Sequence, residues 1–95
     1  MQIADIKEEQ SRLDVEGQIV EKGESRTINL KAGGTMQVCD TVIRDVSGSI
    51  KLTLFGEIIG SVNTGDTVRV TNGYTRAFRG ELSLNIGRFG KLAVL

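Results

Sequence analysis

The chain has 95 residues, 39% of them apolar and 25% charged, and its 12 basic side chains balance 12 acidic ones. This size and composition predict one folded domain spanning residues 1–95 and exclude a disordered chain. The sequence has no histidine and only one cysteine, Cys39. This excludes an internal disulfide, a metal site of the common zinc types and acid–base catalysis by histidine. We therefore expect a binding protein rather than an enzyme, with no cofactor.

The sequence also carries information about the compartment. Its apolar runs are shorter than the ~18 residues that a membrane span requires, and a lone cysteine is typical of a reducing compartment. These features predict a cytoplasmic, nucleoid-associated protein, or a nuclear one in a eukaryote, with no membrane partner. The chain stops at the apolar sequence KLAVL, which favours a domain cut from a longer protein.

The charges are unevenly distributed along the chain. Residues 1–25 carry seven acidic and three basic side chains, and residues 26–95 carry nine basic and five acidic ones. The two parts therefore have net charges of −4 and +4. Such asymmetry is compatible with a local anionic partner, although an uneven solvated surface explains it equally well.

Alternation of apolar and polar residues predicts five strands. In chain order they cover residues 12–20, 35–45, 49–55, 67–74 and 81–87. Between the third and fourth strands, the aliphatic residues of GEIIGSVNTGD (56–66) would line one side of a helical turn or two. The stretch GESRTINLKAGG (23–34) is predicted to be a loop between glycines.

These strands are too few for a seven-stranded sandwich. Gly17 lies in the middle of the first strand and indicates a strong bend, as where one strand serves two sheets. A small, partly open barrel removes most free strand edges. The predicted fold is therefore all-β, a five-stranded OB-fold barrel with a short helix between the third and fourth strands.

Phe55 lies on the polar side of the clearest strand. The alternation in SIKLTLF (49–55) turns the aliphatic side chains inward, so Phe55 shares the outer side with Lys51 and Thr53. One interpretation is that the ring covers the short helix or an edge of the barrel. The other is that it forms a stacking platform for nucleobases, all of which have a flat π-face.

Tyr74 belongs to a second unusual stretch, GYTRAFRG (73–80). Its parity follows that of the two preceding valines of the strand and points the ring inward, which predicts a ring at the edge of the core. A bulge at Asn72 and Gly73 would instead turn it outward.

Phe78 is expected in a loop over residues 74–80, between Arg76 and Arg79. A buried loop anchor is one possibility. Two neighbouring arginines are more typical of a groove lined with phosphates, so the segment is predicted to clamp bases.

The compound motif RDVSGSIKLTLFGEIIGSVNTGDTVRVTNGYTRAFRGELSLNIGRFG (44–90) resembles the single-OB, single-stranded-DNA-binding proteins of archaea and their simple eukaryotic relatives. These belong to the wider replication protein A family. The resemblance covers the C-terminal two-thirds well and the N-terminal third loosely.

The resemblance implies stacking aromatics at Phe55, Tyr74 and Phe78. Relatives often have Trp at the first two positions, which implies smaller stacking faces and weaker binding here. It also implies DNA contacts by Arg26 and Ile28 in the first loop. Some relatives have a further aromatic where this chain has Asn85.

The sequence therefore predicts sequence-tolerant binding of single-stranded DNA in replication, recombination or repair. The candidate binding residues are Phe55, Tyr74, Phe78, Arg26, Ile28, Lys31, Lys51, Thr53, Arg76, Arg79, Asn85 and Arg88, the last expected to end a strand beside the groove. Two alternatives stay open, an RNA-binding OB module and a protein-interaction OB domain of a larger replication or repair complex, with further OB domains as partners.

Overall fold

The computed structural model describes the backbone of residues 2–95, and the side chains of these residues except at positions 78 and 87–89. In chain order this part contains the 3-10 helix η1 (Ile3–Asp5), β1 (Leu13–Lys22), β2 (Arg26–Asn29), β3 (Thr35–Asp45), β4 (Gly48–Phe55), α1 (Ile58–Ser61), β5 (Thr67–Phe78) and β6 (Glu81–Val94). The all-β prediction is confirmed. No helix within residues 2–95 has the length and hydropathy that a membrane span requires.

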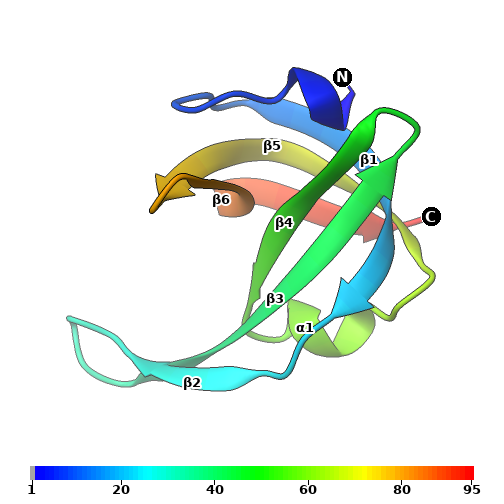
Figure 1. The fold of residues 1–95 in the computed structure, drawn as a ribbon. Helices are drawn as coiled ribbons and strands as arrows, with labels where there is room; N and C mark the ends of the chain where they lie inside the picture. The colour runs from blue at the N-terminus through cyan, green and yellow to red at the C-terminus, as the bar shows by residue number, and fades with distance from the viewer. Residues whose placement is uncertain (1) are drawn as a thin grey trace.

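The strands form one closed sheet. Their order is β1-β5-β6-β4-β3-β2, and an additional pairing of β1 with β3 closes the barrel. β4 and β6 run parallel, whereas the other neighbours are antiparallel. β2 and the beginning of β3 form a hairpin that extends away from the barrel, at the lower left of Figure 1. The barrel itself therefore has the five expected strands, and β2 is additional.

β1 pairs with two partners in succession. Its residues Leu13–Gln18 pair with β5, and Gln18–Lys22 pair with β3. Gly17 lies close to this change of partner and packs tightly there, because a Cβ on it would lie only 3.1 Å from the carbonyl oxygen of Arg44. The strand around Gly17 thus pairs with two different strands in succession, but both pairings belong to one sheet, not to the two sheets that the sequence suggested.

The position of the short helix in the strand order was predicted wrongly. α1 lies between β4 and β5, not between the third and fourth strands, because the stretch 23–34 contains a strand and is not only a loop. This strand, β2, has four residues and pairs with β3 from Arg26 to Asn29. A strand this short has too little alternation to be recognised in the sequence, and its pairing with β3 stabilises it.

β5 and β6 are longer than the sequence predicted. β5 continues to Phe78, so the predicted loop 74–80 is mostly strand. β6 continues to Val94, so Arg88 lies within a strand and does not end one. The turn consists only of Arg79–Gly80, with φ of 52° and 79°, which is typical of a two-residue type I′ hairpin. The long pairing between β5 and β6 therefore outweighs the two glycines, Gly73 and Gly80, that had suggested a loop between them.

The barrel interior is aliphatic. Ile50, Leu52 and Leu54 point inward from β4, as predicted, and are at most 7% exposed. Burial of each such side chain stabilises the fold by roughly 1.5–3 kcal/mol. η1 lies near the start of β4 and contributes Ile3 to the core, and α1 follows the end of β4 and contributes Ile59 (Figure 1).

Asp45 connects the N-terminal segment to the β3–β4 turn. Its Oδ1 accepts hydrogen bonds from the backbone N–H and hydroxyl of Ser47 and from the N–H of Gly48. Its Oδ2 accepts one from the N–H of Ile3 at 2.8 Å. The Ser47 hydroxyl, followed by the Ile3 N–H, lowers the pKa of the Asp45 carboxyl below its ordinary value. The ionised carboxylate therefore holds both segments.

The Asp45→Asn variant should melt at a lower temperature than wild type at pH 7, and this gap should narrow below about pH 4. A carboxyl whose folded pKa is lowered stabilises the fold above its unfolded pKa, and this contribution disappears as the pH falls through the folded pKa. Melting temperatures between pH 2 and 8 provide the measurement. Asp5→Asn, at an exposed position of η1, is the control and should change stability little. A gap that stays constant down to pH 2 would contradict the role of the Asp45 charge.

Candidate nucleic-acid interface

The strand register aligns outward-facing side chains in rows, because residues paired across neighbouring strands point to the same side of a sheet. Across β2, β3 and β4, the first row contains Arg26, Val38 and Phe55. Across β3, β4, β6 and β5, the second row contains Asp40, Thr53, Asn85 and Tyr74. Across the same four strands, the third row contains Val42, Lys51, Ser83 and Arg76. We call these three rows the outer face.

Tyr74 lies on the outer face because of a bulge in β5. Against β1, β5 has one extra residue between Val70 and Gly73, which pair with Val15 and Leu13. Asn72 in this stretch has φ of 58°, a left-handed conformation that Asn tolerates better than most residues. Beyond the bulge, Gly73 and Thr75 point inward and are buried, whereas Tyr74 is half-buried on the other side. The bulge therefore decides between the two orientations that the sequence left open.

Gly73 is required by close packing in this bulge. A Cβ there would lie 3.0 Å from Cγ1 of Val70 and 3.1 Å from both the carbonyl oxygen of Asn85 and Cδ1 of Leu84. Neither backbone nor core side chain can move easily in a closed barrel. The turn of Tyr74 toward the outer face thus depends on the small residue before it.

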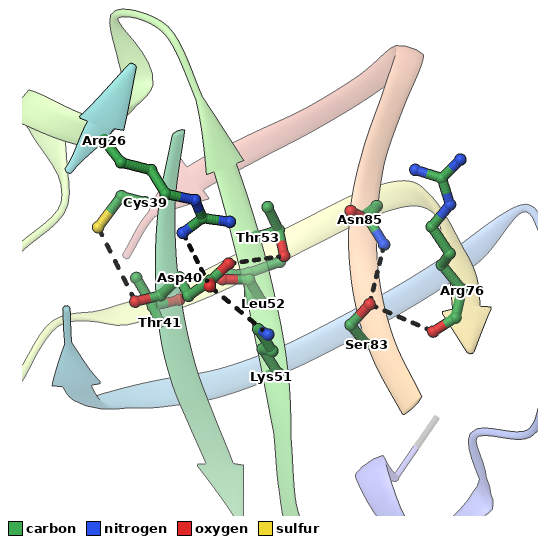
Figure 2. Close-up of polar contacts among 10 residues, drawn as sticks. All are labelled: Arg26, Cys39, Asp40, Thr41, Lys51, Leu52, Thr53, Arg76, Ser83 and Asn85. Atoms are coloured by element: carbon green, nitrogen blue, oxygen red, sulfur yellow. Dashed lines mark hydrogen bonds and ion pairs between the residues drawn. The ribbon is translucent and has the colours of Figure 1, made fainter. Parts of the chain in front are cut away.

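Asn85 forms a polar floor between the strands that carry Phe55 and Tyr74. Its side chain is only 3% exposed, and its Nδ2 donates a hydrogen bond to the Ser83 hydroxyl at 3.3 Å. That hydroxyl in turn donates to the carbonyl oxygen of Arg76 at 3.2 Å, as Figure 2 shows. The network fixes β6 relative to β5 and leaves the Arg76 guanidinium exposed.

Asp40 forms the centre of a charged cluster on the outer face. Its Oδ2 accepts a hydrogen bond from Nη1 of Arg26 at 3.1 Å and lies 3.5 Å from Nζ of Lys51. Its Oδ1 accepts a hydrogen bond from the Thr53 hydroxyl at 3.2 Å. Figure 2 shows the three partners turned toward this carboxylate. Three candidate binding residues thus converge on one acidic side chain.

The charge state of Asp40 follows from these contacts. Partial burial raises the pKa of the Asp40 carboxyl, but the hydrogen bond from Arg26 and the positive charges of Lys51 and Arg26 outweigh it. The pKa therefore lies below its ordinary value. At neutral pH the cluster contains one carboxylate and two cations.

The structure places the candidate residues in three groups. The outer face contains seven of them, Arg26, Phe55, Thr53, Asn85, Tyr74, Lys51 and Arg76, and Ile28 is half-buried on the same side of β2. Lys31 and Arg79 are exposed in the β2–β3 and β5–β6 turns. Phe78 and Arg88 lie in β5 and β6, and their side chains are outside the described part of the chain.

Sequence reasoning missed Asp40. Asp40 has the same parity as Val38 and Val42, but apolar and polar residues are too mixed in 35–45 to show which face of the strand points inward. In the structure the adjacent residues Val38 and Cys39 are both buried. Pairing β3 with the clear strand 49–55 would have placed Asp40 opposite Thr53. The signal was therefore present in the register rather than in the strand alone.

The family of the chain follows from comparison with known proteins. Residues 9–94 match the family described as single-stranded DNA binding protein Ssb-like, OB fold. The chain belongs to this family. It is 32% identical over 91 residues to the single-stranded DNA binding protein Ssb of Saccharolobus solfataricus. The alignment covers 96% of this chain and 61% of that protein. The chain thus spans about three-fifths of the length of this relative.

Solved structures agree with the barrel. The replication factor A related protein of Methanobacterium thermoautotrophicum superposes with a TM-score of 0.83 and 20% identity. This superposition covers all of this chain and 89% of the other one. The second OB-fold domain of replication protein A from Methanococcus maripaludis superposes with a TM-score of 0.82 and 21% identity. That superposition covers all of this chain and 93% of the other one. At these identities the likeness establishes the OB fold alone, and the family match confirms the resemblance found in the sequence.

Replacing Gly73 by Ala should destabilise the fold by about 1–3 kcal/mol, because the added methyl overpacks the bulge. The matched control is Gly60→Ala in α1, where an added Cβ has no neighbour within 4 Å and where Ala should stabilise by about 0.4–1 kcal/mol. Urea unfolding of both variants measures the effect. Equal stability changes would show that the packing around Gly73 is not tight.

Proposed function

We propose that this chain binds single-stranded DNA with little sequence preference, by stacking bases on aromatic rings and by contacting phosphates with cations, in replication, recombination or repair. The single observation that carries the proposal is the outer face, where two half-buried rings and three cations lie on one continuous surface of a chain that belongs to the Ssb-like family.

The rings would supply affinity without a base code. Phe55 and Tyr74 come from β4 and β5, with β6 between them, so they could support different bases of one strand. Stacking of a base on an aromatic side chain contributes roughly 1–3 kcal/mol and tolerates any base. Phe78 is proposed as a third platform from the family resemblance.

The cations would position the phosphate backbone. Arg26, Lys51 and Arg76 lie on the outer face, and Lys31 and Arg79 lie in the two hairpin turns. In Figure 1 these hairpins extend on the same side of the barrel. Phosphate contacts of this kind fix the path of a strand and carry no sequence information. Ile28, Thr53, Asn85 and Arg88 complete the proposed contact surface.

Titrations with single-stranded DNA homopolymers, duplex DNA and oligo-U of equal length test the function. Oligo-dT should bind, and the other DNA homopolymers should bind within a modest factor of it, because stacking does not read the base. Duplex DNA should bind poorly, because its bases are already stacked and paired. Tighter binding of oligo-U than of oligo-dT would indicate an RNA-binding module, and no binding of any nucleic acid would indicate a protein-interaction domain.

Phe55→Ala should weaken oligo-dT binding about 5- to 150-fold, the equivalent of the roughly 1–3 kcal/mol that one stacked base contributes. Its melting temperature should change less than that of a core variant, for which about 3–5 kcal/mol would be lost. Phe55→Leu is the matched control: it retains apolar volume but has no ring, and should bind almost as weakly as the alanine variant. Wild-type affinity in Phe55→Leu would mean that apolar contact, not stacking, holds the base.

A further inference from the structure

Asp40 is placed where an anion-binding surface should not have a negative charge. The side chains of Arg26 and Lys51 are 56% and 33% exposed, and that of Asp40 is 31% exposed. The cluster is therefore open to solvent and to a ligand, not sealed in the core. A phosphate that approached either cation would meet the carboxylate that the cation already contacts.

Every polar contact of Asp40 described above goes to a residue proposed to contact DNA. Oδ2 engages Arg26 and Lys51, and Oδ1 engages Thr53. A carboxylate and a phosphate present the same kind of acceptor oxygens to a guanidinium or an ammonium group. Both ligands cannot occupy the same donors fully, so the carboxylate and a DNA phosphate are alternatives at this position.

We propose that Asp40 is a built-in competitor for phosphate. In the free protein it holds Arg26 and Lys51, and on binding the DNA backbone takes these two cations over. This inference rests on the proposed function and deepens it, because it assigns to one residue the control of how strongly the outer face binds single-stranded DNA.

The energies allow such an exchange. An exposed ion pair of this kind contributes roughly 0.2–1 kcal/mol, which corresponds to a factor of about 1.4 to 5 in affinity. Breaking two of them therefore costs a strand about 2- to 30-fold in binding, which stacking on even one ring can offset. The lowered pKa of the Asp40 carboxyl keeps the competitor charged at neutral pH.

Asp40→Asn removes the charge with little change of shape, because the amide oxygen can accept the hydrogen bond from Arg26 and the amide NH2 can donate one to the Thr53 hydroxyl. At low salt this variant should bind oligo-dT about 2- to 30-fold more tightly than wild type. Each phosphate contact on a single strand contributes about −0.7 to the slope of log K against log salt. Because the DNA backbone takes over both cations in wild type as well, the number of phosphate contacts is the same in both proteins, and the slope should change little.

The matched control is Glu16→Gln. Glu16 forms a similarly exposed ion pair with Arg69 at 3.6 Å, and the substitution changes the net charge equally, but it lies on β1, which contributes nothing to the outer face. It should leave affinity and slope nearly unchanged. If both variants tighten binding to the same extent, the overall charge is the cause, and the proposed role of Asp40 as a competitor is refuted.

A second comparison tests the mechanism directly. Lys51→Ala should weaken binding more in the Asp40→Asn background than in wild type, because only there is the ammonium free of its internal partner. If wild type binds oligo-dT and Asp40→Asn binds it equally or more weakly, Asp40 does not compete with phosphate, and the proposed function remains intact. If wild type binds no single strand at all, the proposed function is wrong and the competitor is wrong with it.

Discussion

The switch of β1 from one partner to another is the constraint on which the rest of the structure depends. Its first half pairs with β5 and its second half with β3, and the two pairings meet at Gln18. Without this double pairing the sheet would stay open, with free edges at β1 and β3. Closure fills the interior with aliphatic side chains, so any binding site has to be built on the outside of the barrel.

The sequence predicted the fold where alternation is strong. The strand that contains Ile50, Leu52 and Leu54 was found with its correct inward face, and the helical turn after it was located by its aliphatic residues. The errors occurred where pairing with a distant strand decides the structure. The four residues of β2 and the second half of β6 have weak local patterns, and both are strands because their neighbours offer free hydrogen-bonding edges.

The candidate site was predicted in part for the same reason. Phe55 could be assigned to the outer side from its own strand, since parity within one strand needs no partner. The orientation of Tyr74 could not, because it depends on the bulge at Asn72, and the sequence supported two outcomes. Asp40 could not be connected to Arg26 and Lys51 from its own strand, since these contacts join three strands and depend on the register between them.

The bulge in β5 has a consequence for how this segment can change in length. Side chains of a strand alternate, so the one extra residue sets the phase of all that follow it. Deleting either Asn72 or Gly73 would exchange inside and outside for the rest of β5. Tyr74 and Arg76 would then enter the aliphatic interior, where an unpaired guanidinium is strongly unfavourable, and Thr75 would leave it. Insertions or deletions of a single residue are therefore excluded here, while the chain can still vary the identity of the outward side chains.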